Sequence, residues 1–166
     1  MAANAFISFF DKAEGESVQK GKEKWVEISG WDWALEADTS WTRGGGASVG
    51  KPSPGRLAFE HRFDTASTVL LGHICSGKAF PKVELQVTKA AAGGTPETCF
   101  TMTMEGAFVT QVSNAGTDDG VIEQRVEIVF KTVRIAYRPQ DPRSGHLGAP
   151  RSFGWDIPAG TVTTGA

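Results

Sequence analysis

The chain has 166 residues, with 17 Lys and Arg against 19 Asp and Glu, which gives a net charge of -2. This length fits a single domain over residues 1–166, and the interspersed charges argue against a nucleic-acid partner, which would need a basic patch. Two cysteines, Cys75 and Cys99, are too few for a disulfide framework, and their spacing to each other and to the three histidines is not that of a metal site. We therefore expect no metal and no cofactor, and we expect both cysteines to be small, buried and reduced.

The apolar run near the start, AFISFF, has no basic segment before it and stops at Asp11. A secretory signal peptide needs a basic segment followed by an apolar one, and a membrane-spanning helix needs about 20 apolar residues. We expect neither a signal peptide nor membrane insertion, so the protein should be cytoplasmic when it is made.

The stretch ISGWDWALE changes the side of the chain on which apolar residues fall. Val26 and Ile28 share one parity and Trp31 and Trp33 share the other, so a regular strand would point the two pairs to opposite faces. A β-bulge at Ser29–Gly30 would supply the slip of one residue, and bulges bend strands. The pattern favours a small closed barrel or a sharply coiled sandwich, with Trp31 and Trp33 in its core.

The segment from residue 41 to residue 56 is rich in Gly, Ser and Pro, which predicts a long loop and not a packed strand. Loops of this length are usually functional or disordered. Within it, GGASVGKP resembles a phosphate-binding loop up to Lys51, but Pro52 stands where a hydroxyl should reach a magnesium ion. Nucleotide binding is therefore disfavoured.

One segment has the pattern of a helix, over residues 65–76, with Asp64 or Thr65 as its cap and Gly77 as its stop. Its buried stripe should comprise Val69, Leu70 and Ile74, with Leu71 as a further candidate.

The clearest strands alternate apolar and polar residues over 83–88 and 100–105, and a turn-rich segment joins them as in a hairpin. A later segment, EQRVEIVFKTVRIAYRPQ, changes its apolar side near Lys131–Thr132, and FGWDI alternates again at 153–157. A segment of this kind either carries a bulge or has both faces buried, one of them against a neighbouring subunit. The expected fold class is mainly β, a small two-sheet β-barrel with one flanking α-helix and a long extended loop.

No catalytic constellation stands out. His61, His73 and His146 are widely separated, and no serine or cysteine lies in a recognisable nucleophile motif. We expect no enzyme activity. The five tryptophans leave open a carbohydrate-binding β-sandwich module in which some of them form a sugar-stacking platform, with Trp41 the best candidate for exposure.

Several motifs, in this order and spacing, resemble the Hcp (haemolysin-coregulated protein) family, the tube proteins of bacterial type VI secretion systems. They are AFISFFDKAEGES, EISGWDWALE, GGGASVGK, STVLLGHICSGKAFPKVELQVTKA, VEIVFKTVRIAYRPQ and FGWDI. The resemblance implies a barrel subunit that forms hexameric rings, which stack into an inner tube and carry or chaperone small effectors in the lumen.

The resemblance also implies partners and a destination. The partners would be further copies of the chain, a contractile sheath, a spike protein and the effectors, and the protein would be secreted to the extracellular space or a target cell without a signal peptide. In that setting the 41–56 loop would lie across the adjacent subunit. The expected interface residues are Trp41, Arg43, Gly44, Gly45, Gly46, Ser48 and Lys51.

Overall fold

A computed structural model describes residues 4–42 and 46–165, and for residues 40–42 and 47 it describes the backbone alone. Short strands dominate, because runs of alternating apolar and polar residues end at glycine-rich turns. The strands are β1 (Ala5–Ser8), β2 (Val26–Asp32), β3 (Leu35–Thr42), β4 (Gly46–Pro54), β5 (Leu57–Arg62), β6 (Phe80–Ala90), β7 (Pro96–Gly116), β8 (Ile122–Val129), β9 (Thr132–Tyr137), β10 (Arg151–Asp156) and β11 (Thr161–Gly165). One helix, α1 (Thr65–Ser76), and one 3₁₀ turn, η1 (Phe10–Lys12), complete the described elements.

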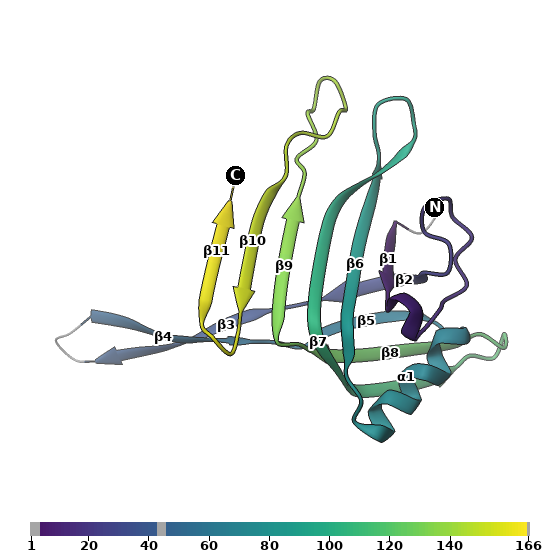
Figure 1. The fold of residues 1–166 in the computed structure, drawn as a ribbon, viewed down its shortest axis with the longest axis horizontal. Helices are drawn as coiled ribbons and strands as arrows, with labels where there is room; N and C mark the ends of the chain where they lie inside the picture. The colour runs from purple at the N-terminus through teal and green to yellow at the C-terminus, as the bar shows by residue number, and fades with distance from the viewer. Residues whose placement is uncertain (1–3, 43–45, 166) are drawn as a thin grey trace.

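Six strands close into a barrel in the order β7-β6-β1-β2-β5-β8, because β8 pairs back onto β7. The upright strands β6, β7, β9, β10 and β11 form one layer, and β2, β5 and β8 run across behind it (Figure 1). The inner faces of both layers supply the core, which includes the alternating residues predicted on β6 and β7. The predicted two-sheet barrel with a single flanking helix is confirmed.

The long strand β7 belongs to both layers. Its residues 100–105 pair with β9, and its residues 108–116 pair with β8. Gly106 lies between these parts with φ +62, a left-handed value that glycine adopts without strain. The predicted change of face near Lys131–Thr132 is therefore a corner at which the chain passes from β8 to β9, and the segment is two strands and not one.

The predicted bulge in β2 is present. Ile28 pairs with His61 and Gly30 pairs with Glu60, so Ser29 is the extra residue. Beyond the bulge, Trp31 pairs with the fully buried Phe59 and so points to the inner face, as Ile28 does. The slip lets residues of opposite parity share one face.

The prediction that Trp31 is core is wrong, because this part of β2 has reached the open rim of the barrel. Trp31 is 36% exposed and stacks on Phe100, with ring centroids 5.3 Å apart. Trp33 is half-buried as expected of a residue packed against the core, and its indole nitrogen donates to the Gly55 carbonyl at 3.2 Å.

The helix α1 has the predicted caps. The Asp64 carboxylate accepts from the Ala66 amide at 3.0 Å, the Ser67 hydroxyl accepts from the Asp64 amide at 2.9 Å, and Gly77 ends the helix with φ +67. Of the predicted stripe, Leu70 is buried, and Val69 and Ile74 are partly buried against the core.

Both cysteines are free, and Cys99 is buried as predicted. Cys75 is exposed, which corrects the prediction that it is buried, because it lies on the side of α1 that faces away from the barrel.

The segment predicted as a loop over residues 41–56 is largely strand. β3 and β4 pair with each other as a separate two-stranded sheet, which we call the arm (residues 35–54). The arm projects from the body of the subunit (Figure 1). The prediction failed because composition disfavours a packed strand, whereas an edge ribbon outside the core tolerates proline and glycine.

Candidate subunit interface

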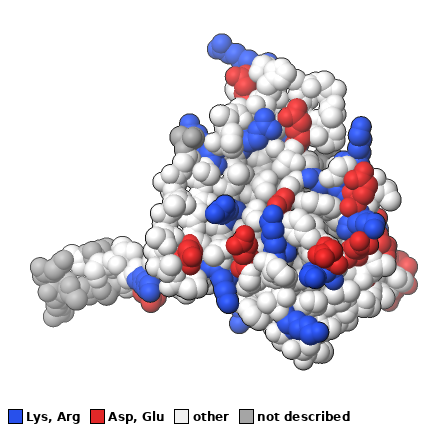
Figure 2. Space-filling view, viewed as in Figure 1, with Lys and Arg blue, Asp and Glu red and all other residues white. Residues whose placement is uncertain are grey.

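The arm has one apolar face and one polar face. Leu35 pairs with Pro54, Ala37 with Pro52 and Thr39 with Val49, so these side chains share a face. Glu36, Asp38 and Ser53 alternate with them and lie on the other face. Figure 2 shows the arm standing clear of the body.

The apolar face of the arm is uncovered in the subunit. Leu35 is 45% exposed and Val49 is 72% exposed, and Pro52 and Pro54 are also exposed. A two-stranded ribbon is only marginally stable in water without something to pack on its apolar face. This arrangement suits a ribbon that packs on a partner.

Four of the seven predicted interface residues lie on β3 or β4: Trp41, Gly46, Ser48 and Lys51. Trp41 pairs with Ala47, and Ser48 pairs with Ser40, close to the end of the ribbon. Gly46 begins β4 with φ +76, and Lys51 is exposed on β4. The remaining predicted residues, Arg43, Gly44 and Gly45, lie outside the described residues, as does the side chain of Trp41.

The residues that sequence reasoning missed are Leu35, Val49, Pro52 and Pro54. The signal was the alternation of Leu35 and Ala37 with Glu36 and Asp38, and of prolines at 52 and 54. The glycine-rich composition of the segment favours a loop, so composition alone does not predict these strands.

The near-miss phosphate loop is part of the arm. Residues 46–52 lie on β4, which is followed by β5. A phosphate-binding loop must connect a strand to a helix N-terminus, and this stretch does not.

A buried polar network joins β5, β8 and the start of α1. The His61 ring nitrogen Nε2 is 2.9 Å from the Gln124 side-chain oxygen, and the Gln124 amide nitrogen donates to Asn114 at 2.8 Å. The other ring nitrogen, Nδ1, lies 3.9 Å from the Asp64 carboxylate and has no hydrogen-bond partner among the described residues. Burial raises the pKa of Asp64, against the opposing effects of His61 and of the Ala66 amide.

Beside this network lies a hollow of about 770 Å³, lined in part by Glu16, Glu27, Arg62 and Asp64. The Glu16 and Asp64 carboxylates already accept from the first amides of α1, at Thr65 and Ala66. Their acceptor capacity therefore serves the helix terminus.

Three further features bear on the kind of partner that the described residues could bind. Within residues 4–42 and 46–165, no cluster of His, Cys, Asp and Glu has an arrangement suited to a metal ion. No helix in the same part of the chain is long and apolar enough to span a membrane. Figure 2 shows Lys and Arg interspersed with Asp and Glu, without a patch of one sign.

Described tryptophans do not form a sugar-stacking platform. Trp155 is buried, Trp33 packs on the core, and Trp31 is already stacked on Phe100. Lys22 lies over the ring of Trp25, with its ammonium 4.6 Å from the ring centroid. The carbohydrate-binding alternative therefore has no support from these side chains.

Comparison with known proteins identifies the family. Residues 6–137 match the family described as "Type VI secretion system effector, Hcp". Protein hcp1 of Pseudomonas aeruginosa is 28% identical over 158 residues, which cover 95% of this chain and 96% of that protein. The Major exported protein of the same organism is 28% identical over 109 residues, which cover 64% of this chain and 61% of that protein.

Solved structures have the same fold. The crystal structure of Hcp1 from Salmonella typhimurium matches with a TM-score of 0.79 at 28% identity, covering 98% of this chain and all of that one. The structure of a type six secretion system protein matches with a TM-score of 0.87 at 24% identity, with the same coverage. The chain belongs to the Hcp family, the tube proteins of the type VI secretion system.

Proposed function

We propose that this tube subunit forms hexameric rings that stack, and that the arm is a main clasp between copies. The observation that carries the proposal is the amphipathic arm, whose apolar face has Leu35 and Val49 exposed in the isolated subunit. A contact between two different surfaces of neighbouring copies is heterologous, and such contacts either close into a ring or continue as a filament. A tube of stacked rings needs one contact that closes the ring and another that continues along the tube.

The same proposal extends to partners and destination. The stacked rings would lie inside a contractile sheath behind a spike protein, carry small effectors in the lumen, and leave the cell with them. A relative named Major exported protein supports export. The proposed role is structural and not catalytic. His61 lies in the core, the His73 ring stacks on Phe80 with centroids 3.9 Å apart, and His146 lies in the segment between β9 and β10.

The first experiment removes the arm. Glu36 pairs directly with Ser53, so replacing residues 37–52 with Asn-Gly closes the ribbon with a two-residue turn, and Ser53 supplies the closing amide. No barrel strand is altered, so far-UV circular dichroism should show a folded barrel. The mass from light scattering should fall toward that of a monomer.

A matched pair of point variants tests the face of the arm. Val49→Glu places a charge on the apolar face, and Ser53→Glu places it on the polar face of the same strand. Val49→Glu should weaken assembly at least about tenfold, which is about 1.4 kcal/mol, and Ser53→Glu should leave it near the wild-type value. Intact rings from the arm-shortened protein, with unchanged stability toward dilution, would show that the arm is not the clasp.

A further inference from the structure

His61, on β5, is a buried side chain with one ring nitrogen left unpaired. The residue is 1% exposed, and Nδ1 has no hydrogen-bond partner among the described residues. Buried polar atoms are nearly always hydrogen-bonded, because an unpaired one loses its contact with water and gains nothing in return. The unpaired nitrogen therefore points to a bond that forms only under some conditions.

The other ring nitrogen fixes the orientation of the ring. Nε2 lies 2.9 Å from the side-chain oxygen of Gln124, which is fully buried, and the Gln124 amide nitrogen donates to Asn114 at 2.8 Å. The Gln124 oxygen is an acceptor, so Nε2 carries the ring proton. Gln124 on β8 and Asn114 on β7 are both uncharged. Nδ1 is left to accept a hydrogen bond, or to bind a proton and donate one.

A carboxyl group faces Nδ1. Oδ1 of Asp64, the cap of α1, lies 3.9 Å away, and the Asp64 side chain is 10% exposed. A hydrogen bond between nitrogen and oxygen needs about 2.7 to 3.2 Å, so the two atoms face each other without a bond. An ionised carboxylate has no proton to donate, and neither has Nδ1 in this tautomer. One added proton, on either atom, would supply the missing donor.

Burial favours the form of this pair that carries one proton. Without a proton the pair is negatively charged, with two protons it is positively charged, and with one it has no net charge. A buried site disfavours net charge, and a buried charge that remains is best placed in an ion pair. Two groups this close take up their protons as a pair and not independently.

The other ionisable groups near the pair line the hollow of about 770 Å³ that Asp64 also lines: Glu16, Glu27 and Arg62. Burial raises the pKa of Asp64 and the Glu16 carboxylate adds to this effect, against the opposing effect of His61. Because Asp64 lines the hollow, protons from solvent reach a pair whose ring is fully enclosed.

We infer that His61 and Asp64 hold one proton between them, and that this shared proton fastens the start of α1 to β5. When the proton binds, Nδ1 and the carboxyl group approach to hydrogen-bond distance while Asp64 still caps the helix through the Ala66 amide. When the proton leaves, this bond is lost and a charged carboxylate remains in a largely buried position. The pair is therefore a pH-sensitive lock within a single subunit, and it does not depend on how copies assemble.

The sign of the pH dependence follows from counting protons. Above about pH 6.5, the ordinary value for histidine, the unfolded chain holds no proton on these two residues, whereas the folded pair still holds one. The lock is therefore closed at about pH 6. Its contribution to stability is lost as the pH rises through the value at which the folded pair releases its proton.

NMR of the wild-type protein with isotope-labelled histidine and aspartate tests whether the proton is shared. The Nδ1 signal of His61 and the carboxyl carbon signal of Asp64 should change together as the pH is raised, with one common midpoint above about 6.5, while Nε2 keeps its proton. Two separate midpoints, with that of Asp64 near its ordinary value of 3.8, would overturn the inference. This measurement needs no variant, so it does not depend on whether a variant folds.

Amide hydrogen exchange tests whether the proton fastens the helix. Exchange rates in α1, divided by the rates of an unstructured chain at the same pH, should rise at least about threefold in the wild type between about pH 6 and about pH 9. In Asp64→Asn the rise should be absent, because asparagine caps the helix and its amide donates to Nδ1 at every pH.

Glu16→Gln is the matched control. Glu16 also accepts from an amide at the start of α1, at Thr65, and lines the same hollow, but no bond or ion pair joins it to His61 among the described residues. It should keep the rise seen in the wild type. An equal rise in Asp64→Asn, or a rise that Glu16→Gln abolishes, would overturn the lock.

Discussion

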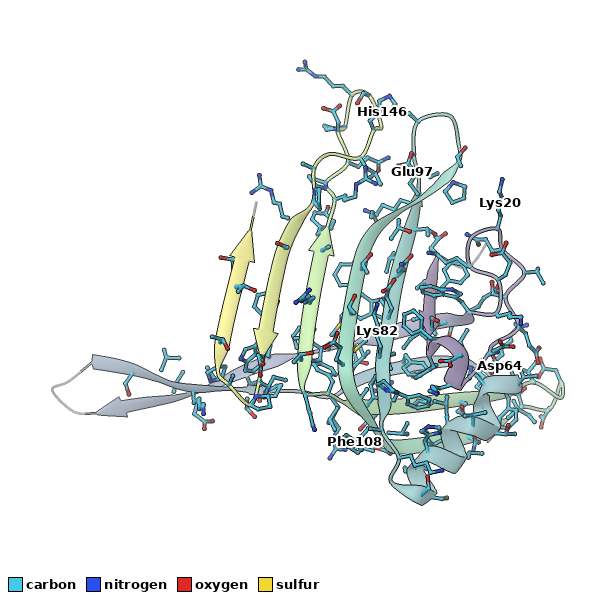
Figure 3. The ribbon with its side chains drawn as sticks, viewed as in Figure 1. Lys20, Asp64, Lys82, Glu97, Phe108 and His146 are labelled. Atoms are coloured by element: carbon cyan, nitrogen blue, oxygen red, sulfur yellow. The ribbon has the colours of Figure 1, made fainter. Side chains whose placement is uncertain are left out.

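Asp64 has two roles at the start of α1. Figure 3 labels Asp64 at this end of the helix. Its carboxylate caps the helix through the Ala66 amide, and the same group lies 3.9 Å from Nδ1 of the buried His61, which has no hydrogen-bond partner among the described residues. Because the Gln124 amide nitrogen donates to Asn114, its oxygen faces His61, and we assign the ring proton to Nε2. Burial disfavours the ionised Asp64 carboxylate more than His61 and the Ala66 amide favour it.

This geometry predicts the pH dependence of an Asp64→Asn variant. Burial raises the pKa of Asp64, so the folded protein holds this proton more tightly than the unfolded chain does. The resulting stabilisation is complete below the ordinary pKa of 3.8 and is lost as the pH rises through the raised value. Asparagine still caps the helix but does not titrate.

The free energy of unfolding of Asp64→Asn, relative to that of the wild type, should therefore increase as the pH rises from about 3 to about 7. Urea titrations at several pH values measure it. If the variant instead becomes less stable relative to the wild type as the pH rises, the folded protein favours the ionised carboxylate of Asp64 and not the carboxylic acid.

At the scale of elements, the bulge in β2 decides which side chains enter the barrel. Ser29 is its extra residue, and its hydroxyl donates to the Glu60 carbonyl at 3.1 Å. If the strand kept all its residues but had no bulge, Val26 and Ile28 would point inward and Trp31 and Trp33 would point outward. The bulge is therefore the physical reason for the switch of parity in the sequence.

Inserting an alanine between Ser29 and Gly30 should consequently destabilise the barrel far more than replacing Ser29 with alanine. The insertion shifts the residues after the bulge by one position and sends one set of inward side chains to the other face, so we expect a loss of at least about 3 kcal/mol, the scale of losing a buried aromatic side chain. Ser29→Ala keeps the bulge and loses one exposed hydrogen bond, at most about 1 kcal/mol. Denaturant unfolding followed by tryptophan fluorescence measures both, and similar losses would show that the register does not depend on the bulge.

At the scale of the whole molecule, the barrel packs its core within the subunit, whereas two segments outside the barrel leave apolar side chains exposed. The arm exposes Val49 on its apolar face, and β11, the last strand of the large sheet, exposes Val162. The two surfaces lie on different sheets. A subunit with two separate apolar surfaces can both close a ring and stack, which one surface alone cannot do.

The side chains proposed to make the contact on the arm, Leu35 and Val49, are apolar. Assembly should therefore not weaken at high salt. Between 0.1 and 1 M salt the Debye length falls from about 10 Å to about 3 Å, which suppresses contacts made between surface charges. The concentration of half-assembly should rise less than about threefold over this range, as measured by sedimentation velocity. A rise of more than about tenfold would place the contacts on charged residues such as Arg125 and Glu60 of the barrel exterior.

The sequence alone determined the fold class, the helix and the bulge. Alternation over β6 and β7, the Asp64 and Gly77 caps, and the switch of parity at Ser29–Gly30 are local signals, and each depends only on residues a few positions apart. The order of motifs also identified the family. These features could be predicted because the period of a strand and the cap of a helix are set by the local backbone.

Only the tertiary structure decided which apolar residues remain exposed. Trp31 has the parity of a core residue, yet it lies at the rim because the barrel ends there. The composition of the segment predicts a loop, but pairing between β3 and β4 makes the arm an amphipathic ribbon. Val162 is exposed because β11 lies beyond the barrel, next to β10 and at the end of the sheet. Burial depends on what lies opposite in space, and residues distant in sequence supply it.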